Sequence, residues 1–192
     1  MFETLKKHLN ATTPFSDEEY DKVISLMKPQ KLKKKEHLFN GGEIAKYVGF
    51  INKGCLRYYY LDAKAEEHIL YFAFEEWWIG DLESFYSNEP TQNYLQALED
   101  CEIFLMDLHA FDTARSTIKA FQRFIDIKFR RAYTSTQKRM FETKSETAEE
   151  KYLRLLKTYP DVLLRVPQHY VASYLGIKPE SLSRIRKKLS GN

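Results

Sequence analysis

The stretch QHYVASYLGIKPESLSRIRKKL, residues 168–189, decides the fold of the C-terminal part of this chain. Gly176 can supply the positive φ of a tight turn, and Pro179 fits the first position of a following helix, where its missing N–H costs nothing. The apolar side chains recur at the spacing with which two short helices bury a shared face: Val171, Leu175, Ile177, Leu182 and Ile185. The pattern predicts a helix-turn-helix, whose second helix enters the DNA major groove. An ordinary helical hairpin is the alternative.

The charge of this segment favours DNA binding. From Leu164 to Asn192 there are six basic side chains and one acidic one, a local charge of 6 − 1 = +5 on a chain whose total is +3. The basic residues are Arg165, Lys178, Arg184, Arg186, Lys187 and Lys188. A basic tail on a near-neutral body is the electrostatic pattern expected for phosphate contact. Lysine and arginine are, however, also favourable near any helix C-terminus.

Length and composition limit the number of domains and the class of protein. A chain of 192 residues has room for one large or two small domains, and 15% aromatic residues exceed the content of disordered chains. The first residues lack an apolar secretory stretch, and no run approaches the roughly 20 apolar residues of a membrane span. Cys55 and Cys101 lie in apolar surroundings and are expected to be buried thiols. We therefore expect a cytoplasmic protein.

Strand signals dominate from Gln30 to about Leu108, after a helix predicted to begin at the capping-box-like Ser16-Asp-Glu-Glu. Glycines and polar turns separate short apolar runs at residues 47–51, 55–61, 68–74 and 94–98. Many short strands at this spacing predict an antiparallel sandwich or barrel.

The residue pattern changes from strand-like to helical after about Leu108. Residues 110–143 contain no glycine or proline, which predicts one long helix. Its apolar stripe recurs in steps of three or four: Ile118, Phe121, Ile125, Phe129, Ala132, Thr136 and Met140. We expect this helix to pack both on its own β domain and on a second copy of the chain. Another helix is predicted from about Glu146 to Tyr159, with Tyr152, Leu153, Leu155 and Leu156 inward.

A β-barrel, a long helix and a helix-turn-helix, in this order, resemble the cyclic-AMP receptor and fumarate–nitrate reductase regulator family of bacterial transcription factors. Gly42-Glu43 and Lys53-Gly54 look like its turn signatures, and residues 78–82, Trp-Ile-Gly-Asp-Leu, resemble the segment that cradles the cyclic phosphate. The resemblance implies an α+β fold in three parts: a cyclic-nucleotide-binding-like antiparallel β-barrel (jelly roll) in residues 1–109, a long dimerisation helix in residues 110–143, and a helix-turn-helix DNA-binding domain with a truncated wing in residues 144–192.

The resemblance also implies DNA-binding residues. Glu180 and Arg184 stand where the family places base-reading side chains; Glu180 can accept from cytosine N4, and Arg184 can donate to guanine O6 and N7. Five further residues are implied phosphate contacts: Gln168, His169, Lys178, Ser181 and Lys187. Pro179 stands where the best-known member has another base-contacting arginine, so the preferred DNA sequence should differ. The chain stops at Asn192, so we expect most of the family's β-hairpin wing to be missing.

The effector segment departs from the family pattern. Members that bind cyclic nucleotide carry an arginine followed by serine or threonine beyond the Gly-Asp/Glu-Leu segment, but residues 88–93 contain no arginine. A buried cyclic phosphate would lose its bidentate, charge-assisted partner, so cyclic AMP is disfavoured and another effector is expected. The candidate effector-pocket residues are Phe72, Trp78, Gly80, Asp81, Leu82, Thr91 and Gln92.

Two interpretations of the nearby rings stay open. Six aromatic residues either line a pocket for another effector or fill the barrel: Phe72, Phe74, Trp77, Trp78, Phe85 and Tyr86. The five histidines are scattered without metal-site spacing, and no catalytic motif is present. We expect no metal, no cofactor and no enzymatic activity.

The sequence therefore predicts a homodimeric, sequence-specific transcription regulator. Its expected partners are double-stranded DNA, a second copy of the chain and a small-molecule effector, with RNA polymerase as a further candidate and no membrane. The alternative is a small-ligand-binding or protein-interaction module with a vestigial helix-turn-helix. Retention on DNA with a steep salt dependence would discriminate between the two.

Overall fold

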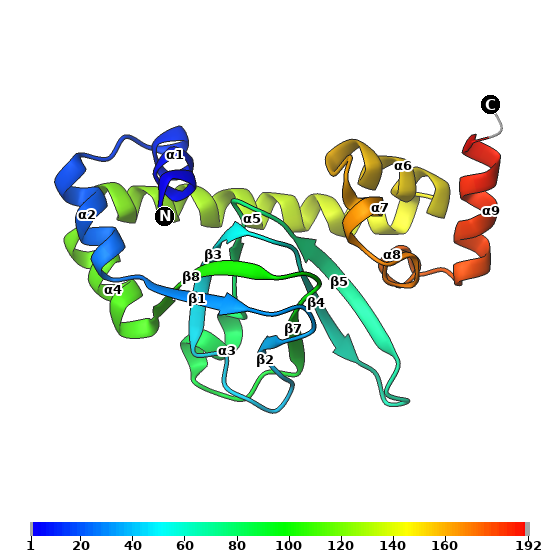
Figure 1. The fold of residues 1–192 in the computed structure, drawn as a ribbon, viewed down its shortest axis with the longest axis horizontal. Helices are drawn as coiled ribbons and strands as arrows, with labels where there is room; N and C mark the ends of the chain where they lie inside the picture. The colour runs from blue at the N-terminus through cyan, green and yellow to red at the C-terminus, as the bar shows by residue number, and fades with distance from the viewer. Residues whose placement is uncertain (1, 191–192) are drawn as a thin grey trace.

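The fold is organised around one long helix, α5 (Lys119–Ser145), which runs across the molecule in Figure 1. The computed structural model describes residues 2–190, apart from the side chains of residues 138–145 and 190. Helices α1, α2 and α4 lie at one end of α5, helices α6 to α9 lie at the other, and the β-sheets lie along its side. The bounds of the N-terminal helices are α1 (Glu3–Thr12), α2 (Asp17–Ser25), α3 (Leu82–Ser87) and α4 (Leu108–Thr117).

The β region consists of two four-stranded antiparallel sheets. The first has the order β1-β8-β3-β6, formed by β1 (Lys28–Leu32), β8 (Cys101–Asp107), β3 (Tyr47–Lys53) and β6 (Trp78–Ile79). The second has the order β2-β7-β4-β5, formed by β2 (His37–Phe39), β7 (Asn93–Ala97), β4 (Leu56–Leu61) and β5 (Glu67–Ala73). Two four-stranded sheets interleaved in this way form a jelly roll. The four predicted strand runs are confirmed to within one or two residues at each end.

The antiparallel prediction is confirmed, but the closed barrel is wrong. Each sheet keeps two edges, and apolar side chains from both sheets fill the space between them: Leu32, Phe39, Ile51, Leu56, Leu95, Ile103 and Leu105. Two sheets that bury a shared core in this way need no closure. The exposed edge strand β1 carries Lys28 and Lys31, which oppose pairing with another strand. Strand alternation in the sequence cannot distinguish this sandwich from a barrel.

The predicted single helix over residues 110–143 is also wrong, because the chain breaks at Ile118. The backbone of Ile118 is extended (φ −114°, ψ 101°) between α4 and α5, and its side chain is buried at 1% exposure. Ser116 and Thr117 donate hydroxyl hydrogen bonds of 2.7 Å to carbonyl groups one turn earlier, and such bonds compete with helix continuation. Neither glycine nor proline marks the break, so periodicity alone missed it.

The apolar stripe of α5 divides into a covered and an exposed part. Phe121 and Ile125 are buried against α1, α4 and the first sheet, and Phe129 is half-buried. Ala132 and Thr136 are exposed. The side chain of Met140, the last predicted member of the stripe, lies outside the described residues.

The helix start predicted at Ser16 is confirmed. Ser16 Oγ accepts from the Glu19 N–H at 3.2 Å and Glu19 accepts from the Ser16 N–H at 3.1 Å, which begins α2. Thr147 and Glu150 form the same box at the start of α6. The C-terminal helices are α6 (Ala148–Thr158), α7 (Val162–Arg165), α8 (Gln168–Leu175) and α9 (Pro179–Ser190). The prediction that Leu153 on α6 faces inward is wrong. Its side chain is 46% exposed and lies off the face that buries Tyr152 and Leu155.

Cys55 and Cys101 are buried free thiols, as predicted. Burial raises the pKa of the Cys101 thiol to about 12, so it stays protonated and unreactive at neutral pH. Among the helices of the described residues, none has the length and apolar character needed to cross a membrane.

Candidate DNA-binding and effector sites

The C-terminal helices α8 and α9 pack as the sequence predicted. Gly176 ends α8 in the left-handed conformation (φ 69°), with its N–H bonded to the carbonyls of Ala172 and Ser173, and Pro179 is the first residue of α9. The side chains of the shared face are turned inward: Val171, Ala172, Leu175 and Leu182 are buried, and Ile177 and Ile185 pack against them. The glycine is needed here because an L side chain rarely adopts this backbone conformation.

The predicted DNA-binding residues lie on the outside of this helix pair. Glu180, Arg184 and Lys187 are exposed and share one face of α9, because they are four and three residues apart. Gln168 and His169 are exposed in the first turn of α8, Lys178 is exposed between the helices, and Ser181 is half-buried. The prediction of a truncated wing concerns the end of the chain. Gly191 and Asn192 lie outside the described residues, so it stays a prediction.

Arg165 and Lys188, both counted among the basic residues of this segment, have internal partners. Arg165 forms a bidentate ion pair with Glu75 (2.9 and 2.8 Å) and a second ion pair with Glu99, both from the β region. Lys188 pairs with Glu149 of α6 at 2.8 Å. The charge count from the sequence therefore overestimates the positive charge available to phosphates.

Helix α8 is docked on the edge strand β5. The Ser173 hydroxyl donates to the Glu67 carbonyl (2.9 Å) and accepts from the Ile69 N–H (3.2 Å), so it completes the hydrogen bonding of that edge. The Arg57 guanidinium lies between the rings of Tyr59 and Tyr170, 4.0 and 3.9 Å from their centroids. One buried apolar cluster runs from β4 and β5 into α6 to α9. The C-terminal helices and the second sheet thus share a core.

In the segment that resembles the family's phosphate cradle, the hydrogen-bond donors surround the chain's own carboxylate. Asp81 is 6% exposed and accepts from Tyr58 Oη (2.9 Å), Asn93 Nδ2 (2.9 Å), Thr91 Oγ1 and the Ser84 N–H (3.3 Å). Burial alone would raise the pKa of Asp81, but these hydrogen bonds outweigh it and hold the pKa below its usual range. A phosphate placed among these donors would meet a buried negative charge instead of a guanidinium.

The seven predicted effector-pocket residues do not converge on one pocket. Trp78, Gly80 and Leu82 line a cavity of about 710 Å³ beside α5. Asp81 and Thr91 belong to the buried carboxylate network, and Gln92 is exposed. Phe72 faces the other way, 5.5 Å from the ring of Tyr174 on α8. Sequence reasoning could not tell that α8 covers the strand face that bears Phe72.

The six rings near this segment likewise serve different contacts. Phe74 stacks on Tyr159 with 4.6 Å between centroids, and Phe85 packs edge-on against Phe111 in the helical core. Trp77 and Trp78 line the cavity beside α5. Three of the six rings, Phe72, Phe74 and Phe85, are therefore buried in the core, Tyr86 is exposed, and the two tryptophans reach the cavity.

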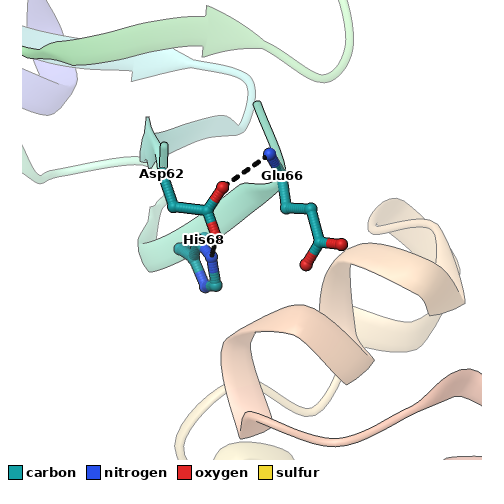
Figure 2. Close-up of side chains that lie close together, drawn as sticks. All are labelled: Asp62, Glu66 and His68. Carbon is teal, nitrogen blue, oxygen red and sulfur yellow. Dashed lines mark hydrogen bonds and ion pairs between the residues drawn. The ribbon is translucent and has the colours of Figure 1, made fainter. Parts of the chain in front are cut away.

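Three potential metal ligands, Asp62, Glu66 and His68, meet in the β4–β5 hairpin, with donor atoms within 4.8 Å of one another. Figure 2 shows that both carboxylate oxygens of Asp62 form hydrogen bonds, one with Glu66 and one with His68. Its Oδ1 accepts from the N–H groups of Lys64 (2.8 Å) and Glu66 (3.0 Å), and its Oδ2 lies 3.0 Å from His68 Nε2. These bonds close the hairpin turn, so we assign the cluster to the turn.

Comparisons with known proteins agree with this architecture. The family described as cyclic nucleotide-binding domain matches residues 29–117. FixK2 from Bradyrhizobium japonicum is 18% identical over 86% of this chain and 85% of its own, with a TM-score of 0.71. The c-di-GMP responsive global regulator CLP of Xanthomonas campestris is 13% identical over 92% of both chains, with a TM-score of 0.70. A CooA mutant from Carboxydothermus hydrogenoformans is 18% identical over 88% and 78%, with a TM-score of 0.68.

A search of curated protein sequences found no match. The family match falls on the jelly roll and α4, and the structural likeness extends over most of the chain. Residues 29–117 are thus similar to the cyclic nucleotide-binding domain family, and the chain has the same fold as FixK2 and CLP.

Proposed function

We propose that this chain is a homodimeric, sequence-specific DNA-binding transcription regulator. The observation that carries the proposal is the exposed row Glu180, Arg184 and Lys187 on α9, opposite the buried Leu182. A carboxylate, a guanidinium and an ammonium on one helix face match the needs of base reading and phosphate contact in a major groove. CLP is named as a global regulator, which supports a regulatory and non-enzymatic role.

Within this proposal the three parts of the chain have separate tasks. The jelly roll in residues 1–109 senses an effector, α5 within residues 110–143 pairs two copies, and residues 144–192 bind double-stranded DNA. RNA polymerase is a further partner in the proposal. The effector differs from cyclic AMP, because the Asp81 carboxylate takes up the donors of Thr91, Asn93 and Tyr58.

The test begins by selecting bound sequences from a random DNA pool with the full chain, which should yield a palindromic site for a dimer. Arg184→Ala should then lose about 1–3 kcal/mol of binding free energy on that site and relax the preference at one base pair in each half. Lys187→Ala should weaken all sequences alike and reduce the salt slope by about one. Both are measured by fluorescence anisotropy at several salt concentrations.

Arg115→Ala is the matched control, since Arg115 is exposed on α4 at the opposite end of α5 from α9. It should bind the selected site as the parent does. An Arg184→Ala protein with the parent's affinity and base preference would refute the role of α9.

The internal ion pairs of Arg165 and Lys188 favour a second candidate function, an interaction module with a vestigial helix-turn-helix. Such a protein would elute from a heparin or DNA column without steep salt dependence. It would show thermal stabilisation by a ligand and no response to DNA.

A further inference from the structure

A series of four side chains, His37, Tyr59, Arg57 and Tyr170, connects strand β2 of the jelly roll to helix α8. His37 Nε2 lies 3.1 Å from Tyr59 Oη, and the centroid of the Tyr59 ring lies 4.0 Å from the Arg57 guanidinium. The centroid of the Tyr170 ring lies 3.9 Å from the same guanidinium. Each member of the series therefore touches the next, from the second sheet to the C-terminal helices.

Arg57 is a buried cation in this series, with 2% of its surface exposed. Its Nε donates to Gln96 (2.7 Å), and its two terminal nitrogens form a bidentate ion pair with Glu67, one bond at 2.8 Å. Because Tyr170 covers one face of the guanidinium, the docking of α8 contributes to its burial. A second cation close to such a buried charge is repelled strongly, since water screens the pair weakly.

The Tyr59 hydroxyl depends on a neutral His37. Tyr59 is 4% exposed, and among the described residues its hydroxyl has His37 Nε2 as its hydrogen-bond partner. We assign the imidazole proton to Nδ1, because Nε2 then accepts the hydroxyl hydrogen. An imidazolium has two N–H donors and no acceptor, so protonation of His37 leaves this buried hydroxyl hydrogen without an acceptor. A buried donor without an acceptor costs free energy.

The groups that face His37 oppose a second positive charge there. Arg57 faces it from β4, the Tyr94 ring from β7, Glu67 from β5 and Glu43 from the turn after β2. Both carboxylates are already engaged, because Glu67 pairs with Arg57 and Glu43 accepts from a backbone N–H of its own turn at 2.8 Å. Burial, and then the charge of Arg57, lower the pKa of His37 despite these two carboxylates.

We propose that His37 makes the docking of α8 on the jelly roll sensitive to acid. A proton on His37 takes the acceptor from Tyr59 and places a cation beside Arg57. The guanidinium then leaves its place against Tyr170, and α8 is released together with the hydrogen bonds of Ser173 to β5.

The direction of the pH dependence follows from the state that binds the proton. The pKa of His37 is lowered while α8 is docked, so the docked state binds this proton less readily than the released state. Docking is therefore strongest above about pH 6.5, the ordinary pKa of histidine, and weakens as the pH falls below it. An effect of this release on DNA binding rests on the proposed function, whereas the release itself does not.

The experiment uses the full chain without DNA and reads the docked contact directly. The Ile69 N–H donates to Ser173 Oγ of α8, so its hydrogen exchange reports the release of α8. Its protection factor, relative to an unstructured peptide at the same pH, should fall about tenfold from pH 7.5 to pH 5.5 in the parent. His37→Gln keeps a neutral acceptor for Tyr59 and cannot titrate, so its protection factor should change less than about twofold.

His109→Gln is the matched control, because His109 is exposed on α4 at the opposite end of α5 from α8. It should behave as the parent does. Equal losses of Ile69 protection in the parent and in His37→Gln, or no loss in the parent, would overturn the proposal. Amides of β3 and β8 should stay protected at both pH values. A parallel loss there would show unfolding of the jelly roll, which would also overturn it.

A second measurement uses the reciprocity of the coupling between His37 and α8. Tyr170→Ala opens the Arg57 guanidinium to water and should raise the pKa of His37, which a titration of the imidazole resonances by NMR measures. Tyr86→Ala removes an exposed ring on α3 and should leave this pKa unchanged. The same His37 pKa in the parent and in Tyr170→Ala would contradict the coupling. The Arg184 test on DNA has a separate readout, so the failure of either idea leaves the other standing.

Discussion

Asp81 is a buried carboxylate held by four donors, and its position decides what the phosphate-cradling segment can bind. Its Oδ2 accepts from Tyr58, Thr91 and Asn93, while Oδ1 caps α3 through Ser84. Charged acceptors form stronger hydrogen bonds than neutral ones. The segment therefore stabilises the fold with the same groups that would otherwise bind an anion.

Asp81→Asn should lower the free energy of unfolding by about 2 kcal/mol at pH 7. The amide keeps the size of the carboxylate, but its nitrogen must face either the Ser84 N–H or the three donors at Oδ2, which leaves donors unpaired. Urea unfolding at neutral pH measures the loss. Asp100→Asn, on an exposed carboxylate, is the control and should have little effect.

The effect of Asp81→Asn should depend on pH. The pKa of Asp81 is lowered in the folded protein, while the pKa of an unfolded aspartate is about 3.9. Its stabilisation is therefore present above about pH 4 and is lost as the pH falls through the folded-state pKa. The stability difference between parent and variant should shrink in acid. A difference that is constant from pH 7 to pH 3 would contradict the assigned charge.

Arg165 joins the C-terminal helices to the turn after β5. Its guanidinium is 25% exposed and pairs with Glu75 and Glu99, and these hydrogen bonds raise its pKa further. Arg165→Met should cost about 1–2 kcal/mol, less than a fully buried pair because of the partial exposure. Chemical denaturation measures this cost, and limited proteolysis should show faster cleavage between residues 158 and 168. Lys188→Met, which removes an exposed pair, should behave like the parent.

At the scale of elements, the junction between α8 and α9 depends on one glycine. A Cβ on Gly176 would meet no atom within 4 Å, so the position is open in space and constrained only by its φ of 69°. The left-handed conformation costs about 1–2 kcal/mol for an ordinary L residue. The turn is thus selected by backbone conformation and not by crowding.

Gly176→Ala should therefore lose about 1 kcal/mol of stability without repacking the helices. Gly176→Asn should lose less, since asparagine tolerates this conformation better. Thermal and urea unfolding of the three proteins give the order. Alanine and asparagine variants with equal losses would show that crowding, not backbone strain, sets the cost.

Elements were predicted well where the signal is local. Ser16 with Glu19, and Gly176 with Pro179, act through atoms a few residues apart, and the helices that they bound are present. The break at Ile118 escaped prediction because neither glycine nor proline marks it and because the burial of its side chain depends on other elements. The effector residues were only partly placed, since α8 covers the strand face that bears Phe72.

At the scale of the whole molecule, residues 130–137 of α5 are not covered by another element of the described chain. Residues 130–137 are all exposed, and Tyr133 is 66% exposed, although Ala132 and Thr136 continue the apolar stripe that Phe121 and Ile125 bury. A helix with an uncovered apolar stripe is stabilised by a partner. The proposed dimer covers this segment with the same segment of a second copy.

Ala132→Glu should convert the dimer to a monomer, because it places a charge within the apolar stripe. Thr134→Glu adds the same charge about half a turn away on α5 and should leave the dimer intact. Sedimentation equilibrium at several concentrations measures both. DNA affinity should fall only in the Ala132 variant. A monomeric parent, or identical masses for both variants, would exclude this interface.

The sequence by itself determined the local elements and the inward face of the C-terminal helix pair, because caps, a glycine, a proline and apolar periodicity act over a few residues. Only the tertiary structure decided which charges remain available and where a cavity forms. Arg165 meets Glu75 across 90 positions of the chain, and Ser173 meets Glu67 across 106. Such contacts depend on how sheets and helices pack, which no short stretch of sequence specifies.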